Sequence, residues 1–232
     1  MISNCSSPSW RQVLALVCGV VVPGVAWAEW RYEAGYQFAH LEGEAPRDAA
    51  YNADLQGIHL AFRESVGNWR GELAGGYQVG SADLERPERP LTSTDETAWD
   101  ADYRIGPVIA SGVWAFGGIA HRRWESDDLE RQLTYSPVGI GVGLPAAWGI
   151  EGEVMVEYWA VWSAEVTDAS AQGALPDTGA GWRVIANVGW VFGERQSLFV
   201  NPYYAEWRLD GGLSDHDTDA QMVGINLGLR WH

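Results

Sequence analysis

Two groups of residues have the types and spacing for acid–base chemistry. Asp215, His216 and Asp217 are consecutive in a polar segment. There His216 could act as a general base that activates water, with a neighbouring carboxylate orienting its ring. Asp100 and Asp102 form an Asp-x-Asp pair, which places two carboxylates on one face of an extended strand. The reaction class that such groups would support is hydrolysis, although an Asp-x-Asp pair also arises in any strand with an acidic face.

A hydrolase with a covalent intermediate would need a nucleophile, and the sequence offers few. The nearest set is His121 with Ser126 and Asp127, but we expect His121 to face inward from a strand and Ser126 to lie in a loop. Cys5 and Cys18 both fall in the N-terminal 28 residues, which we expect to be removed. The sequence contains no nucleotide-binding loop, HExxH or G-x-S-x-G motif. We therefore assign no catalytic residue, no cofactor and no metal site.

The charge and composition narrow the class of protein. The chain has 232 residues, with 31 acidic residues against 15 basic ones and a net charge of -16. This balance argues against nucleic acid as a partner, because binding to phosphates needs a basic face. Hydrophobic residues make up 47% of the chain, which favours a folded protein of one domain.

Residues 1–28 have the pattern of a secretory signal peptide. Arg11 precedes an apolar stretch from Val13 to about Val25, and the segment ends in Ala26-Trp27-Ala28, an A-x-A cleavage pattern. We expect cleavage before Glu29, so that residues 29–232 form the mature domain. No later stretch approaches the roughly 18 apolar residues of a transmembrane helix.

From residue 29 onward, the hydrophobic pattern has a period of two, which is typical of β-strands. In 30–38, for example, aromatic residues and alanine alternate with charged or small residues. We expect ten strands of about 10–13 residues, close to the roughly 9–11 residues with which a tilted strand crosses an outer membrane. Eight strands are the alternative. Four weaker strands are expected at about 54–64, 113–124, 133–144 and 197–208, and the phase of the last is open.

The connections alternate between short and long. Tight turns are expected at 65–68, 111–112, 145–148 and 193–196, and longer polar loops at about 41–53, 80–97, 125–132, 163–181 and 209–219. Aromatic residues gather near both ends of the strands, as they do at membrane interfaces. The expected aromatic girdle is Trp30, Trp69, Trp99, Trp114, Trp124, Trp162, Trp182, Trp190 and Trp231. A soluble barrel or sandwich with these rings in its core is the alternative.

These features together resemble those of small bacterial outer-membrane β-barrel proteins. The resemblance implies an all-β, closed, antiparallel, up-and-down transmembrane barrel, with both termini periplasmic and the long loops extracellular. It also implies a monomer in contact with outer-membrane lipids and lipopolysaccharide. Members of this class usually end on an aromatic residue that the barrel-assembly machinery reads; here His232 follows Trp231 at the end of the amphipathic strand 223–231.

The residues expected to face the lumen carry both charges in balance, with seven acids against seven arginines once Arg63 and Arg123, which are also expected to face inward, are counted. The predicted lumen network is Arg31, Glu33, Arg70, Glu72, Asp100, Asp102, Arg104, Glu151, Glu153, Glu157, Arg183 and Arg230. A barrel of about eight strands is filled by its side chains, whereas open channels have 16–18 strands. We therefore expect a largely plugged, charge-paired lumen and a structural or surface-interaction role, with a narrow cation-preferring channel as the alternative.

The expected loops are strongly acidic. Their carboxylates could bind divalent cations and so bridge to lipopolysaccharide, although Asp215, Asp217 and Asp219 lack a glycine-centred calcium loop. The omptin proteases are ten-stranded barrels with an Asp pair and an Asp/His pair at the outer mouth. Asp100, Asp102 and His216 resemble that set only loosely, since the chain is shorter and the cluster lies in the fifth loop. An omptin-like or lipid A-modifying hydrolase is the further alternative.

Overall fold

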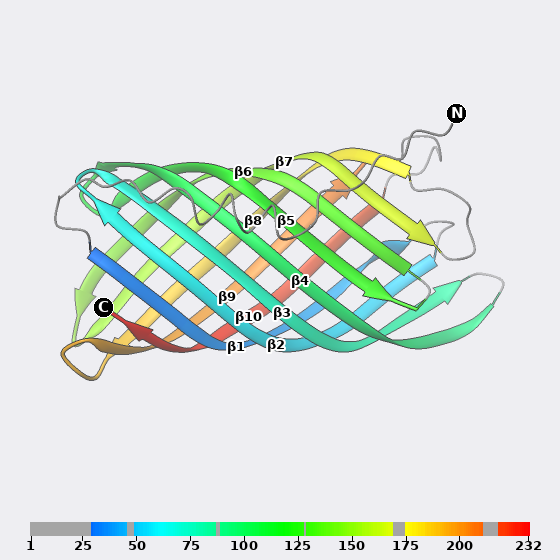
Figure 1. The fold of residues 1–232 in the computed structure, drawn as a ribbon, viewed down its shortest axis with the longest axis horizontal. Helices are drawn as coiled ribbons and strands as arrows, with labels where there is room; N and C mark the ends of the chain where they lie inside the picture. Colours follow the sequence, from blue (N-terminus) through cyan, green and yellow to red (C-terminus); the bar gives the residue numbers. More distant parts are fainter. Residues whose placement is uncertain (1–28, 46–48, 87–88, 128, 169–174, 211–217) are drawn as a thin grey trace, which may run out of the picture.

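The computed structural model describes residues 29–45, 49–86, 89–127, 129–168, 175–210 and 218–232. The expected signal peptide, residues 1–28, and the Asp215–His216–Asp217 cluster lie outside these residues. Ten antiparallel strands form one closed barrel in which each strand pairs with its neighbours in sequence and β1 pairs with β10 (Figure 1). The strands are β1 (Glu29–Ala45), β2 (Ala49–Val66), β3 (Trp69–Arg86), β4 (Arg89–Ala110), β5 (Val113–Ser126), β6 (Leu129–Ala147), β7 (Ile150–Asp168), β8 (Leu175–Val191), β9 (Gln196–Leu209) and β10 (Thr218–Trp231). This confirms the predicted fold class and the count of ten strands.

Short turns join the strands at the end of the barrel that also holds the C-terminus (Figure 1). Three of these turns contain a glycine with positive φ: Gly67 at 58°, Gly112 at 73° and Gly149 at 77°. In the third turn Trp148 also has a positive φ, of 53°. Tight hairpins need such left-handed residues, because they match the twist of the flanking strands. None of the described residues forms a helix long and apolar enough to cross a membrane.

The strands are longer than the sequence pattern predicted. They span 14 to 22 residues, and they extend through most of the polar segments that were expected to be loops. On β1 and β2, for example, the backbone ladder continues to the pair Ala45 and Ala49. The prediction of long loops at 41–53, 80–97 and 125–132 was therefore wrong. Polar composition was interpreted as a sign of loops, but a strand that extends beyond a membrane also has a polar outer face.

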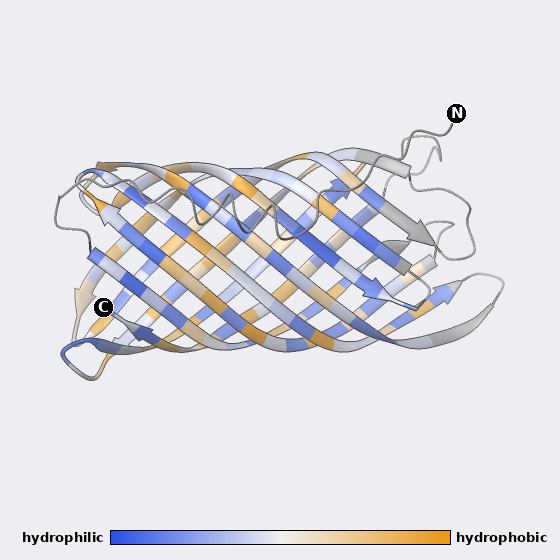
Figure 2. Cartoon of the chain, in the orientation of Figure 1, coloured by the Kyte–Doolittle hydropathy of each residue, from blue (hydrophilic) through white to orange (hydrophobic). Residues whose placement is uncertain are grey.

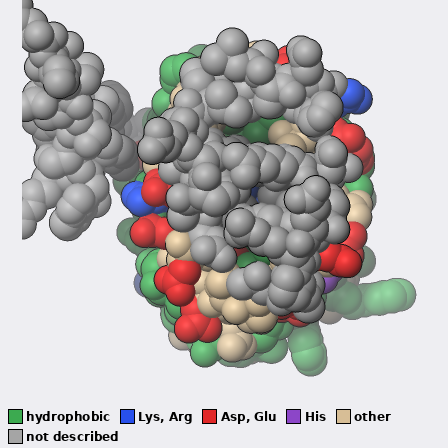
Figure 3. Space-filling view, turned by 90° about the vertical axis from the view of Figure 1, so that its right-hand side faces the viewer, with side chains coloured by type: hydrophobic (Ala, Val, Ile, Leu, Met, Phe, Trp, Pro, Cys, Tyr) green, Lys and Arg blue, Asp and Glu red, His purple; other side chains and the backbone are tan. Residues whose placement is uncertain are grey.

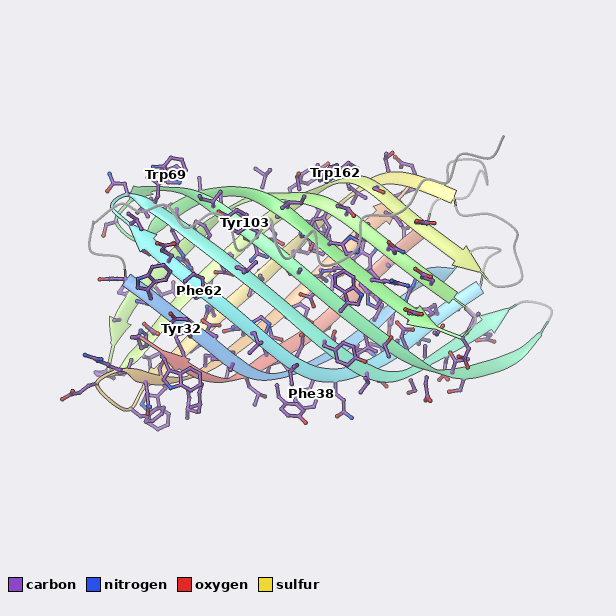
Figure 4. The ribbon with its side chains drawn as sticks, viewed as in Figure 1. Tyr32, Phe38, Phe62, Trp69, Tyr103 and Trp162 are labelled. Atoms are coloured by element: carbon purple, nitrogen blue, oxygen red, sulfur yellow. The ribbon has the colours of Figure 1, made fainter. Side chains whose placement is uncertain are left out.

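The outer wall of the barrel has two zones. From the short turns up to Phe38, Ile58 and Val79, outward side chains are mostly apolar and well exposed; we call this the apolar zone. From His40 on β1 and Gln56 on β2 onward, outward side chains are mostly polar or charged; we call this the polar zone. Figure 2 shows the alternation along the strands, and Figure 4 shows labelled aromatic residues on the outer face. Only the apolar zone has the outer surface of a membrane span.

The interior shows the opposite polarity. Inside the apolar zone the lumen is filled by charged side chains, most of which are buried. At the level of the polar zone it is filled by an apolar core that includes Leu41, Leu55 and Leu133. The polar zone thus has an apolar interior and a polar outer face, as a water-soluble barrel does. The apolar zone has the reverse arrangement.

Candidate functional site

The centre of the charged lumen is Arg104 on β4, whose side chain is 2% exposed. Its Nε lies 2.9 Å from Glu157 Oε2, and its Nη1 lies 2.9 Å from Glu72 Oε1. Its Nη2 also donates to Asp102. One guanidinium therefore joins carboxylates from β3, β4 and β7, because its planar fork presents donors in several directions.

Two further arginines extend this network toward the short turns. Arg63 Nε lies 2.7 Å from Glu72 Oε2, and Arg63 Nη1 lies 3.3 Å from Glu33 Oε1. Arg230 Nε lies 2.8 Å from the same Glu33 oxygen, and its Nη1 lies 2.5 Å from Glu151 Oε1. Glu33 on β1 is thereby tied to β2 and β10, which are its two neighbours at the closure of the barrel.

Across the lumen, Arg70 on β3 and Glu153 on β7 form a bidentate ion pair with distances of 2.5 and 2.7 Å. Trp114 supports both partners. Its indole Nε1 donates to Glu153 Oε1 at 2.9 Å, and its ring lies 4.3 Å from the Arg70 guanidinium carbon. This arrangement combines a charge-assisted hydrogen bond with a cation–π contact.

The structure places the twelve residues of the predicted lumen network on the inner face of the barrel, but not all of them pair. Arg31, near the short-turn mouth, makes one loose ion pair with a described residue, Glu151, at 3.6 Å. Asp100 makes no ion pair with any described residue. Arg63 on β2 faces inward, and so does Arg122 on β5, which was not expected in the lumen.

The predicted aromatic girdle needs a correction at two positions. Trp114 and Trp124, at 2% and 5% exposed, lie inside the barrel. Seven other tryptophans are on the outer wall, at 36% to 59% exposed: Trp30, Trp69, Trp99, Trp162, Trp182, Trp190 and Trp231. The phase of β5 was predicted in reverse, so His121 and Arg123, which were expected inside, face outward. An irregularity in the β4–β5 register between Val108 and Ala110 accompanies this change.

An aromatic cluster, formed by Trp124, Tyr135, Trp159 and Trp207, fills the lumen where the polar zone begins. The rings of Tyr135 and Trp159 are 4.3 Å apart, those of Trp159 and Trp207 are 5.8 Å apart, and those of Trp124 and Trp207 are 5.9 Å apart. Arg131 lies against this cluster, with its guanidinium carbon 3.7 Å from the centre of the Tyr51 ring and 5.5 Å from that of Trp124. The sequence did not predict this cluster, because the strands that carry its rings also carry aromatic residues that face outward.

Two of the cavities inside the described barrel bear on the closure of the lumen. The larger, of about 320 Å³, lies at the short-turn mouth and is lined by Arg31, Arg70, Glu151 and others. The smaller, of about 10 Å³, lies between the charged network and the aromatic cluster. The charged network and the aromatic cluster form two layers that separate the short-turn mouth from the opposite end of the barrel. The rim of that opposite end carries acidic side chains (Figure 3).

Among the described residues, the predicted acid–base groups are not assembled into a site. Asp102 is held by Arg104 and by Arg183, the latter at 2.8 Å, deep beneath the aromatic cluster. His121 faces outward, and its Nδ1 lies 2.8 Å from Thr134 Oγ1. Among the described residues, no group of three or more His, Cys, Asp or Glu could hold a metal ion.

A histidine that the sequence analysis overlooked lies on the outer wall at the start of the polar zone. His40 Nδ1 is 2.7 Å from Asp54 Oδ1, and its Nε2 is 2.9 Å from Glu42 Oε1. These two hydrogen bonds raise the pKa of His40 above its ordinary value. Because both ring nitrogens are occupied by carboxylates, His40 has no free nitrogen with which to act as a base on a substrate.

The comparisons with known proteins identify the fold. No protein-family model matches the sequence, and no curated protein matches it either. Among solved structures, the outer membrane protease OmpT from Escherichia coli matches with a TM-score of 0.56 and 10% identity, over 88% of this chain and 96% of that one. OprG, an outer membrane protein from Pseudomonas aeruginosa, matches with a TM-score of 0.43 and 10% identity, over 89% and 95%. The fold is thus that of outer-membrane β-barrels, and no subfamily is identified.

Proposed function

We propose that this chain is an integral outer-membrane barrel with a closed lumen, which acts as a structural element or as a platform for surface interactions. The observation that supports it best is the double closure of the lumen. A buried ion-pair network centred on Arg104 fills the apolar zone, and the aromatic cluster fills the barrel above it. A ten-stranded barrel is narrow enough for side chains to close it in this way.

The orientation follows from the two zones of the wall. The apolar zone would span the lipid, with the short turns and both termini on the periplasmic side. The polar zone would then project outside the cell. Exposed carboxylates gather on its outer face and rim: Glu85, Asp95, Glu125, Glu165, Asp210 and Asp219. Divalent cations could bridge such carboxylates to the phosphates of lipopolysaccharide.

We propose no catalytic role for this chain. Asp102 is neutralised by two arginines, and both nitrogens of His40 are occupied. A monomer fits the fold, because the closed barrel has no free strand edge. The amphipathic β10, which ends at Trp231, would be the segment that the barrel-assembly machinery recognises.

The test is conductance of the protein purified from the envelope of an expressing Gram-negative host. Slower gel migration after boiling would first establish that the barrel is folded, and an open porin would serve as the positive control in the same planar bilayer. We expect no discrete current steps from this protein. Cation-selective steps that shrink in Glu153→Gln would overturn the closed-lumen proposal and make the chain a narrow channel.

A further inference from the structure

Arg122 on β5 is a buried cation without an ion pair among the described residues. Its side chain lies inside the barrel and is 6% exposed. Its register partner on β4 is Asp100, so the two side chains start next to each other on the inner face. Nevertheless, the Arg122 guanidinium lies 5.0 Å from the centre of the Trp159 ring, and its Nη1 lies 4.0 Å from Met222 Sδ. A buried charge in such a position needs a polar partner.

Two oxygen acceptors converge beside this cation, above Gly76 on β3. A Cβ atom at Gly76 would lie 2.5 Å from Gln37 Oε1 and 3.0 Å from Asp100 Oδ1. Gln37 Oε1 is buried and accepts no hydrogen bond from the described residues. Gln78 Nε2 is also buried and donates no hydrogen bond to them. Leaving a buried polar atom unpaired is costly, so this group of atoms requires a partner that can both donate and accept.

The small cavity of about 10 Å³ lies among these residues, since Gln37, Gln78, Asp100, Arg122 and Met222 all line it. Its size is close to that of a single water molecule. We propose that this cavity is a binding site for one structural water. The water donates to Gln37 Oε1 and to the Asp100 carboxylate, and it accepts from Gln78 Nε2 and from the Arg122 guanidinium.

The chemistry of the lining favours water over an ion. Two acceptors and two donors match the two hydrogens and two lone pairs of water. A metal cation would face the positive charge of Arg122 and the amide donor of Gln78. An anion such as chloride would face the carboxylate of Asp100 and the oxygen of Gln37. The bridge lets Asp100 and Arg122 act as a water-mediated pair between the charged network and the aromatic cluster.

Substitutions at Gly76 test this site, because a Cβ atom there would lie beside two of its four groups, Gln37 Oε1 and Asp100 Oδ1. Gly76→Ala would displace the water with a methyl group, whereas Gly76→Ser would supply a hydroxyl that can replace part of its hydrogen bonding. We expect the folding equilibrium constant of Gly76→Ser to exceed that of Gly76→Ala by about tenfold, as the cost of unpaired buried groups implies. Gly75 is the matched control, since it is the adjacent glycine on β3 and faces the outer wall.

Unfolding of the purified barrel by guanidinium in detergent micelles provides the measurement. Equal stabilities for Gly76→Ala and Gly76→Ser, or the same difference at Gly75, would overturn the proposal. A crystal structure that resolves ordered water gives the second readout. A density peak within hydrogen-bond distance of the four groups, lost in Gly76→Ala, supports it. A direct hydrogen bond between a protonated Asp100 and Gln37, with no peak between them, would refute it, as would density for an ion.

Discussion

Removing the central arginine of the lumen should destabilise the barrel strongly. Arg104→Met deletes three contacts, to Glu72, Asp102 and Glu157. The loss is not three times that of one pair, because other arginines remain. Asp102 and Glu157 keep Arg183, at 2.8 and 2.6 Å. Glu72 likewise keeps its ion pair with Arg63. The change therefore leaves the network with one uncompensated negative charge.

Breaking a buried pair by removing one partner costs about 3–5 kcal/mol, and we expect Arg104→Met to lose that much free energy of unfolding. Glu72→Gln in the same chain should recover part of the loss, because it restores the charge balance. The assay is guanidinium unfolding in micelles, followed by tryptophan fluorescence and by the gel shift on boiling.

The matched control is Arg123→Met, which removes the same residue type from the outer wall. Arg123 pairs with Glu125 at 3.1 Å and Glu130 at 2.9 Å, and its side chain is 32% exposed. Ion pairs at the surface contribute about 0–1 kcal/mol. If Arg104→Met costs no more than Arg123→Met, or if Glu72→Gln adds to the loss instead of reducing it, the reasoning is wrong.

Two other predictions concern the polar zone and the girdle. Trp124→Ala should cost about 3–5 kcal/mol of unfolding free energy, because it empties part of the aromatic cluster. Trp99→Ala, which truncates an outward ring, should cost clearly less. Equal losses in guanidinium unfolding would contradict the placement of Trp124 inside the barrel. The raised pKa of His40 means that its ion pairs stabilise the fold below the ordinary pKa of histidine and lose this effect as the pH rises through the raised value. The difference in stability between the wild type and His40→Gln should shrink on that rise and stay below about 1 kcal/mol, because the groups are exposed; a difference that grows with pH would contradict the assignment.

The barrel itself could be predicted from the sequence because its strongest signal is local. In the proposed membrane placement, one face of each strand in the apolar zone meets lipid and the other meets the lumen, so hydropathy alternates with a period of two. Where the outward set was aliphatic or aromatic and the inward set charged, as in 30–38 and 150–158, each side chain was assigned to the correct face. The inward charges then followed directly.

The errors arose where hydropathy does not report the environment. On β5, Trp114 and Trp124 were assigned to lipid because tryptophan is apolar. Inside, however, the Trp114 indole donates to Glu153 and its ring packs against Arg70. A ring with a polar N–H group suits a charged lumen as well as a membrane interface. The polar zone was mistaken for loops for a related reason, since the sequence does not show where the lipid ends.

The two zones close the lumen through different forces, and this determines what is needed to open it. In the proposed membrane placement, the outer face of the apolar zone meets lipid, so the hydrophobic effect does not favour the inward side. The interior is then held by arginines that join distant strands, as Arg104 joins β4 to β7. In the polar zone the outer face meets water, so the hydrophobic effect drives Trp159 and Trp207 into the lumen. Because the layers are stacked along one axis, a substitution that loosens either layer leaves the other in place. A conducting variant therefore requires changes in both the charged network and the aromatic cluster. We expect that a single substitution in either layer produces no current.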